Sequence, residues 1–184
     1  MTRWLLRAMT ELTSRKWLSR ATGRLAKSPL SRRFIARFAA MYGIPVDEAE
    51  KPLKEYVTLN EFFTRRLKPG MRPVDAAEDA LVSPVDALVT ACGTIRDGLL
   101  LQVKGQDYSL DELLNGSPRL SQYRHGFFWV LYLSPTDYHR IHSPCSGTVV
   151  ETEHVSGRVY PVNEFGLTSM SRVLSRNERL ITYI

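Results

Sequence analysis

The chain has 184 residues, 43% of them hydrophobic and 24% charged, which predicts an ordinary globular protein with one sizeable core. Its two cysteines, Cys92 and Cys145, lie far apart, which excludes a disulfide framework and a four-thiolate zinc site and favours a reducing compartment. The longest apolar run, Phe127 to Leu133, is far shorter than the roughly 20 residues of a membrane-spanning helix. With no signal peptide visible, we expect a protein that is neither secreted nor membrane-spanning.

The net charge of +6 is unevenly distributed. Residues 1–40 hold ten lysines and arginines against one glutamate, a net charge of +9, so the remainder carries −3. A basic arm on a slightly acidic body predicts an anionic partner for the arm, either lipid head groups or nucleic acid phosphates. No helix-turn-helix, RNA-recognition or OB-type signature accompanies the charge, which argues against nucleic acid.

A basic amphipathic helix is predicted from Trp4 to Leu18, where apolar residues recur at helical spacing beside arginine and lysine. This pattern is typical of helices in a membrane interface, and also of soluble helices that pack an apolar stripe on the body. The residues expected to bind a membrane are Trp4, Leu5, Arg7, Leu12 and Trp17.

A break is predicted around residues 21–23, and a second helix then carries Phe34 and Phe38 and stops at Gly43. Thr58 and Glu61 form a capping box for a short third helix. The turn-rich basic stretch at residues 65–73 predicts a boundary near residue 70, between a helical region at 1–70 and a β-rich body at 71–184.

Strands and short helices are predicted after residue 70, which gives an α+β fold whose helical, membrane-facing N-terminal part precedes a mostly antiparallel β body. The expected strands are 88–95, 99–103, 127–133, 147–153, 158–162 and 179–184, and the expected helices are 109–114, 168–174 and a two-turn helix after Ser134. The last strand has no turn or polar tail after it, so we expect an incomplete β body whose missing partners lie beyond Ile184.

The stretch from Ser134 to Cys145 is the candidate for chemistry, because titratable residues crowd together there. In the expected helix His139 and His142 lie on one face. Two readings stay open: Asp86 and these histidines as two thirds of a nucleophile-activating triad, or His139, His142 and Cys145 as metal ligands. Scattered glycines exclude a dinucleotide or phosphate loop.

Five segments resemble the bacterial phosphatidylserine decarboxylase family. They span most of the chain, and the longest is similar to the family's Leu-Ser-Pro-x-Asp-Tyr-His-Arg-x-His-x-Pro-Cys pattern. The matching residues are Asn60-Glu61-Phe62-Phe63-Thr64-Arg65 with Arg72-Pro73, Ser83-Pro84-Val85-Asp86, Lys104-Gly105-Gln106-Asp107-Tyr108-Ser109-Leu110, Leu133 to Cys145, and Arg176-Asn177-Glu178-Arg179.

The resemblance implies a pyruvoyl enzyme that removes the serine carboxylate of phosphatidylserine to give phosphatidylethanolamine. It implies that Asp86 orients His142 for self-cleavage of a Gly-Ser bond in a zymogen, and that His139 is an acid–base group in decarboxylation. The implied partners are phosphatidylserine, an anionic membrane surface, a C-terminal pyruvoyl-bearing chain and a second copy in a homodimer. The implied location is peripheral, on the cytoplasmic face of the bacterial membrane.

Two departures from the family pattern qualify these expectations. Ala87 stands where the family has glycine, and the Leu-Gly-Ser-Thr segment whose serine becomes the pyruvoyl group has no counterpart before Ile184. We therefore expect this chain to hold the base and the orienting acid without the nucleophile, and to be inactive alone. The alternatives are a non-catalytic truncated paralogue that binds membrane lipid, and a hydrolase with a His/Cys metal site.

Overall fold

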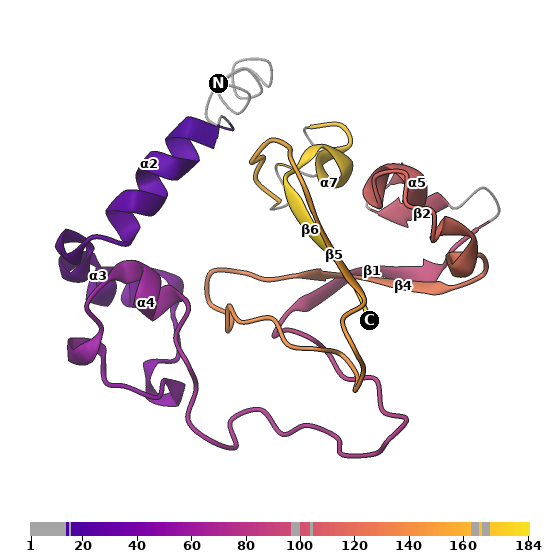
Figure 1. Cartoon of the computed structure of the whole chain (residues 1–184). Helices are drawn as coiled ribbons and strands as arrows, with labels where there is room; N and C mark the ends of the chain where they lie inside the picture. Colours follow the sequence, from indigo (N-terminus) through magenta and orange to yellow (C-terminus); the bar gives the residue numbers. More distant parts are fainter. Residues whose placement is uncertain (1–13, 15, 97–99, 104, 163–165, 167–169) are drawn as a thin grey trace. The chain divides into compact units, whose positions relative to one another are not determined.

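The chain divides into two compact units in the computed structural model, which describes residues 14, 16–96, 100–103, 105–162, 166 and 170–184 (Figure 1). Unit 1 comprises residues 1–19, 89–132 and 148–184, and unit 2 comprises residues 20–88 and 133–147. The segment that carries the candidate histidines therefore belongs to unit 2, together with the helical residues that precede the strands.

Helix α2 (Lys16–Ala26) continues through the predicted break at residues 21–23, so that prediction was wrong. Alanine is a strong helix former, and a single glycine within a helix costs only about 1 kcal/mol, too little to end it. The helix ends instead before Ser28, which has an extended ψ of 149° and precedes Pro29. The predicted helix over residues 4–18 lies mostly outside the described residues, as do Trp4, Leu5, Arg7 and Leu12.

The second predicted helix is confirmed as a short 3₁₀ turn, η1 (Pro29–Phe34), followed by α3 (Ile35–Tyr42). Gly43 ends α3 in the left-handed conformation with φ of 63°. The N–H of Ile44 then donates to the carbonyl of Ala39 at 2.9 Å, so the last turn closes as glycine-capped helices commonly do.

The core of unit 2 forms where α3 meets α4 (Leu59–Phe63), and Leu53 of the 3₁₀ turn η3 (Leu53–Glu55) packs against it. Another 3₁₀ turn, η2 (Val46–Glu48), precedes η3 in the chain. The predicted capping box is confirmed at Thr58, whose hydroxyl accepts from the N–H of Glu61 at 3.0 Å. Buried Ser31 joins the helices, because its hydroxyl donates to the carbonyl of Ala26 and accepts from the N–H of Leu59. The buried core residues are Ile35, Ala39, Ile44, Tyr56 and Phe62.

The described residues of unit 1 form three two-stranded sheets. The pairs are β1 (Leu88–Thr94) with β4 (Phe127–Tyr132), β2 (Leu100–Val103) with β3 (Gln106–Ser109), and β5 (Glu151–Val155) with β6 (Arg179–Tyr183). The last two pairs are antiparallel, and Leu101 lies opposite Tyr108 in one of them. The helical turns of unit 1 are α5 (Leu110–Leu113), η4 (Leu120–Tyr123) and α7 (Val173–Arg176).

The α+β class is confirmed, and most strand predictions hold within one or two residues. Strand β3 was not predicted, β5 begins four residues late, and residues 158–162 form only one bridge, between Arg158 and Asn177. The predicted terminal strand is confirmed as β6, which pairs with β5 over five residues of each strand. Among the described residues, no helix combines the length and apolar content needed to cross a bilayer.

Candidate active site

The segment from Leu133 to Gly147 is not the predicted two-turn helix. It begins with a turn in which the N–H of Asp137 donates to the Ser134 carbonyl at 3.0 Å and the N–H of Ser134 donates to the Asp137 carboxylate at 2.6 Å. The residues that follow have no regular secondary structure, with bends at Pro144, Cys145 and Ser146. The prediction failed because a segment this short cannot offset the cost of helix nucleation, and the rest of unit 2 supplies its hydrogen bonds instead.

Two backbone hydrogen bonds hold the histidine segment against the segment that precedes Asp86. The N–H of His142 donates to the Pro84 carbonyl at 2.8 Å, and the N–H of Val82 donates to the Pro144 carbonyl at 2.8 Å. The structure therefore brings the Ser83–Asp86 and His139–Cys145 motifs together, although about 50 residues separate them in sequence.

His139 is half-buried, and its ring stacks on Phe63 with the centroids 4.0 Å apart and the planes 26° from parallel. Its Nε2 lies 2.9 Å from the Ser134 carbonyl oxygen. A carbonyl only accepts, so Nε2 carries the proton and Nδ1 holds the lone pair when the ring is neutral. Burial lowers the pKa of His139, and the Ser134 carbonyl only partly offsets that effect. The ring is therefore neutral at pH 7, with Nδ1 able to accept a proton.

His142 is exposed, and its Nε2 lies 3.1 Å from the hydroxyl of Tyr138, whose ring stacks on the imidazole at a centroid distance of 5.5 Å. His142 and His139 therefore have different partners and different exposure. The two histidines are not on one helical face, as the predicted helix required, but at separate positions along a segment without regular secondary structure.

Asp86 makes no hydrogen bond to His142 in this structure. Both of its carboxylate oxygens accept from the Arg72 Nε, at 2.9 and 2.7 Å, and the Arg72 Nη2 lies 2.6 Å from Oδ2. The same guanidinium pairs with Glu48 at 2.8 Å. These two carboxylates raise the pKa of Arg72, and Asp86 contributes most. Sequence reasoning assigned no role to Arg72, although it lies in one of the motif segments.

Arg65 is a second residue to which the sequence alone assigned no role. Its side chain holds the backbone just before His139. Its side chain is 2% exposed, and Nη2 donates to the carbonyls of Thr136 and Asp137 at 3.1 and 3.4 Å. In the opposite direction, Nε of Arg140 in the histidine segment donates to the carbonyl of Thr64 at 2.9 Å. Arg65 lies two residues after α4 and three residues after Phe62, which is fully buried. This helical spacing from a buried aromatic residue is the signal that could have identified Arg65.

The metal-site reading finds no support in the structure. His139 donates to a carbonyl and His142 contacts Tyr138. Within the described ranges, no group of three histidine, cysteine, aspartate or glutamate side chains is arranged to hold a metal ion.

Comparison with known proteins decides the family. The sequence model of the phosphatidylserine decarboxylase family matches residues 59–184. A phosphatidylserine decarboxylase proenzyme of Geobacillus kaustophilus is 47% identical over all 184 residues, which span 70% of that protein. The proenzymes of Brevibacillus brevis and Anoxybacillus flavithermus are 46% and 44% identical, over 91% and 99% of this chain and 60% and 69% of their own lengths. The chain belongs to the phosphatidylserine decarboxylase family.

The members of this family are lyases, and all five motif segments recognised in the sequence lie within the matched range. Ala87, which replaces the family's glycine, is not among the described residues with positive φ. Its Cβ therefore introduces no backbone strain at this position.

The Arg-Asn-Glu-Arg motif of the decarboxylase family has a structural role in unit 1. Arg179 donates to four carbonyls, those of Glu112, Leu113, Ser175 and Asn177, at 2.6 to 3.1 Å. Asn177 pairs through its amide with the backbone N–H and carbonyl of Tyr160, at 2.8 and 3.0 Å. The motif thus joins β6 to α5 and to the loop before α7.

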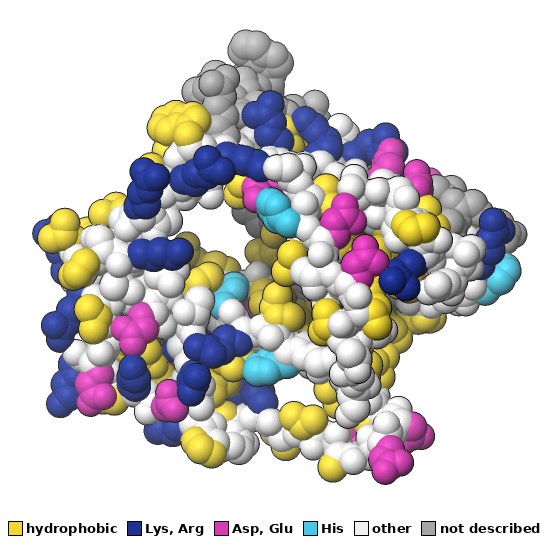
Figure 2. Space-filling view, viewed as in Figure 1, with side chains coloured by type: hydrophobic (Ala, Val, Ile, Leu, Met, Phe, Trp, Pro, Cys, Tyr) yellow, Lys and Arg dark blue, Asp and Glu magenta, His cyan; other side chains and the backbone are white. Residues whose placement is uncertain are grey.

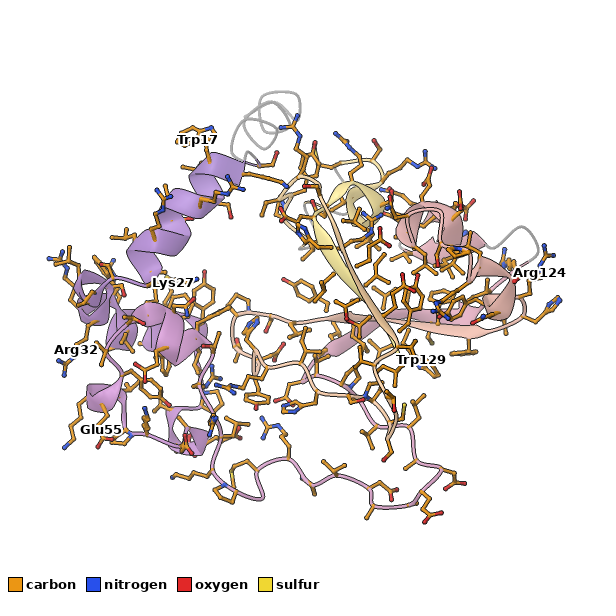
Figure 3. The ribbon with its side chains drawn as sticks, in the orientation of Figure 1. Trp17, Lys27, Arg32, Glu55, Arg124 and Trp129 are labelled. Carbon is orange, nitrogen blue, oxygen red and sulfur yellow. The ribbon has the colours of Figure 1, made fainter. Side chains whose placement is uncertain are left out.

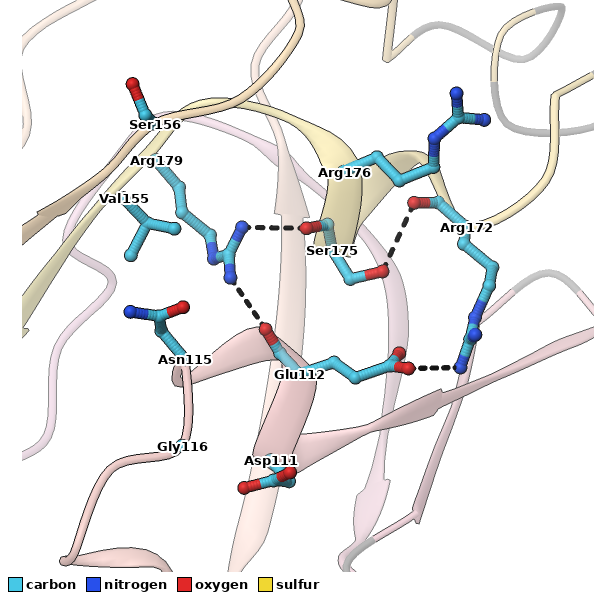
Figure 4. Close-up of a pocket in the computed structure, with 10 residues that line it drawn as sticks. All are labelled: Asp111, Glu112, Asn115, Gly116, Val155, Ser156, Arg172, Ser175, Arg176 and Arg179. Atoms are coloured by element: carbon cyan, nitrogen blue, oxygen red, sulfur yellow. Dashed lines mark hydrogen bonds and ion pairs between the residues drawn. The ribbon is translucent and has the colours of Figure 1, made fainter.

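A hollow of about 570 Å³ lies beside this motif (Figure 4). Its arginines are already engaged, since Arg179 binds the carbonyls and Arg172 forms an ion pair with Glu112 at 2.6 Å. The acidic side chains of Asp111 and Glu112 line the same wall. With its positive groups paired internally, this hollow has the features of a packed structural junction rather than an anion site.

Proposed function

We propose that this chain carries the aspartate and histidine part of a pyruvoyl-dependent phosphatidylserine decarboxylase, which converts phosphatidylserine to phosphatidylethanolamine. The observation that supports this most directly is His139, a neutral imidazole with a free Nδ1 on a segment paired to the Asp86 motif. A pyruvoyl group supplies the electrophilic carbonyl that withdraws electrons as the carboxylate leaves. His139 and His142 can supply the proton transfers that the formation and the reaction of such a group require.

His139 suits the lipid reaction because it is held in one tautomer. The Ser134 carbonyl fixes the Nε2 proton, and stacking on Phe63 fixes the ring plane, so Nδ1 points in one direction. With a pKa below its ordinary value, the ring exchanges a proton without a lasting positive charge. We assign it the acid–base role in decarboxylation.

His142 suits self-cleavage, because it is exposed and therefore accessible to an incoming hydroxyl. For Asp86 to orient it, the carboxylate must give up part of its contact with Arg72. Arg72 also pairs with Glu48 at 2.8 Å, so its charge keeps a partner when Asp86 turns away. We propose that Arg72 holds Asp86 until the cleavage site is seated. The pyruvoyl-bearing chain, and a second copy in a homodimer, are the proposed protein partners.

The roles of the two histidines can be separated by variants of the complete translation product that contains these 184 residues. We expect His142→Ala to remain as one uncleaved chain on a denaturing gel. We expect His139→Ala to cleave but to release labelled carbon dioxide from phosphatidylserine at least about 100-fold more slowly. Asp86→Asn should block cleavage, whereas Arg72→Gln should permit it. His125→Asn is the matched control, since His125 is exposed in unit 1 and its φ of 60° is one that asparagine tolerates.

Normal cleavage of His142→Ala would contradict the assignment of the base. Normal decarboxylation by a cleaved His139→Ala enzyme would contradict the acid–base role. Loss of either reaction in His125→Asn would indicate general misfolding.

We further propose that the basic N-terminal region contacts the anionic, cytoplasmic face of the membrane peripherally. None of the α2 residues is buried, and Trp17, 63% exposed, projects from the helix (Figure 3). Figure 2 shows basic side chains gathered along the region of α2, which carries Lys16, Arg20 and Arg24. An exposed tryptophan among basic residues suits a lipid interface, where apolar burial and attraction to anionic lipid add.

Co-sedimentation with liposomes tests this contact. We expect binding to vesicles that contain phosphatidylglycerol, weaker binding at 0.5 M salt than at about 0.05 M because charges are screened, and weaker binding of Trp17→Ser. Trp129→Ser is the matched control, because Trp129 is 51% exposed but lies on β4 of unit 1. Binding that ignores the anionic lipid content would contradict the proposal.

A further inference from the structure

The guanidinium of Arg65 is buried without a counter-ion. Its side chain is 2% exposed, yet Nε and Nη1 have no hydrogen-bond partner, and only Nη2 is bonded, to two neutral carbonyls. Arg65 also makes no ion pair with any part of the chain that the structure describes. Burial lowers its pKa, but an arginine stays charged at neutral pH. The centroid of the Phe62 ring lies 5.5 Å from the guanidinium carbon and offers a cation–π contact, but a buried charge with two unbonded N–H-bearing nitrogens and no counter-ion is still costly.

Arg65 lines a hollow of about 250 Å³ in unit 2, whose walls are mostly basic. Lys51, Arg66 and Arg140 line it as well, against two acidic residues, Glu50 and Glu61. Lys51 pairs with Glu61 at 3.0 Å. Arg140 uses only Nε for the Thr64 carbonyl, and its two Nη groups make no hydrogen bond to the described residues. The lining therefore has a net excess of two positive charges.

A second buried polar group faces the same hollow. The hydroxyl of Tyr56 has no hydrogen-bond partner, and the residue is 2% exposed. Burial raises the pKa of this tyrosine, an effect larger than the opposing influence of the nearby Lys51 backbone and of Arg65, so the hydroxyl keeps its proton and can donate it. Two unsatisfied donor groups, one of them charged, line one small basic hollow.

We propose that this hollow binds a phosphate-type oxyanion, with Arg65 as its central ligand. The Nε–H and Nη1–H groups of Arg65, which have no partner, can each donate to an oxygen of such an anion while Nη2 stays on its two carbonyls, and Lys51 and Arg140 add positive charge to the lining. The volume of about 250 Å³ accommodates a phosphate group. The occupant would also affect the histidines, because Arg65 bonds to the carbonyls of Thr136 and Asp137, two residues before His139.

The occupant has two chemical sources. One is the phosphodiester of a lipid head group, which for phosphatidylserine rests on the function proposed above, and the other is free phosphate. The proposal of an anion site is argued from the unbonded polar groups of Arg65 and Tyr56 and from the position of Arg140. It does not depend on the decarboxylase activity.

Thermal unfolding of the complete translation product in inorganic phosphate, against chloride at equal ionic strength, tests the site. Ligands that bind the native state raise its midpoint. We expect phosphate to raise it for the wild type, and expect the apparent affinity to fall at least about tenfold in Arg65→Met. Lys51→Gln, on a lysine whose side chain is 46% exposed, should fold normally and bind roughly threefold more weakly. Arg124→Gln, an exposed arginine of unit 1, should respond like the wild type.

An absent phosphate response in the wild type, or equal responses of Arg65→Met and Arg124→Gln, would overturn the proposal. Glycerophosphoserine then identifies the source. If it binds more tightly than phosphate, and Lys51→Gln raises the KM for phosphatidylserine without lowering kcat, the site takes the lipid head group. A response to phosphate alone assigns free phosphate. An Arg65-dependent phosphate response in a product without decarboxylase activity would refute the proposed function and leave the anion site intact.

Discussion

At the scale of single residues, the two histidines differ in what surrounds them. His139 is half-buried between Phe63 and the Ser134 carbonyl, whereas His142 is exposed beside a tyrosine hydroxyl. One ring is therefore held neutral in a fixed tautomer, and the other can turn toward a new partner. Residues three apart in the sequence acquire distinct chemistry because one faces the α4 aromatic and the other faces solvent.

The lowered pKa of His139 predicts a loss of stability in acid. In the unfolded chain the imidazole titrates near its ordinary pKa of about 6.5. In the folded protein the pKa is lower, so the unfolded state binds more protons as the pH falls below about 6.5. The free energy of unfolding of the complete product should then decrease from pH 7.5 to pH 5.5, and His139→Gln should lose less over the same interval. Urea unfolding at the two pH values measures this difference, and equal losses would contradict it.

At the scale of elements, two glycines on neighbouring helices have opposite roles. Gly43 caps α3 with φ of 63°, a conformation that a residue with a Cβ adopts at a cost. Gly23 lies within α2, and a Cβ added there would meet no atom within 4 Å. The first glycine is required by the backbone, and the second only weakens its helix.

Exchange of each glycine for alanine should change stability in opposite directions. We expect Gly43→Ala to destabilise the protein by about 1 kcal/mol. We expect Gly23→Ala to stabilise α2 by roughly 0.5–1 kcal/mol and to raise its helicity. Chemical denaturation followed by circular dichroism measures both changes. A neutral Gly43→Ala would indicate that the end of α3 is free to relax into another conformation.

The elements that the sequence predicted correctly are those with a local cause. The capping box at Thr58 and the glycine stop at Gly43 depend on neighbouring residues only. The helix expected after Ser134 failed because distant partners decide that segment, namely the Pro84 carbonyl and the side chain of Arg65. The pairing of Asp86 with Arg72 was invisible for the same reason, since neither spacing nor periodicity identifies which cation lies opposite a carboxylate.

At the scale of the whole molecule, the chain passes four times between the two units, at residues 19/20, 88/89, 132/133 and 147/148. Each unit nevertheless has its own buried core, one around Phe62 and one around Tyr108. The candidate histidines depend on the first core, through Phe63 and Arg65. From the sequence, the family and the candidate residues could be identified, but the allocation of residues 133–147 to the helical unit could not.

Because the cores are separate, we predict that a destabilising substitution in one unit increases local unfolding mainly within that unit. Phe62 is fully buried, and Phe62→Ala should cost about 3–5 kcal/mol. Hydrogen exchange should then accelerate across residues 20–88 and 133–147, while the amides of β2 and β3 in unit 1 keep most of their protection. Uniform acceleration across both units would show that they unfold as one. Leu180→Ala, on a side chain 66% exposed, provides a control with little effect.

The two backbone bonds beside the candidate site also fix its alignment. Both accepting carbonyls belong to prolines, Pro84 and Pro144, which have no N–H to donate. A slip of two residues that set Pro144 in the place of His142 would bring a ring without a donor to the Pro84 carbonyl and remove that bond. The prolines of the two motifs therefore disfavour this alternative alignment of the acidic and histidine segments.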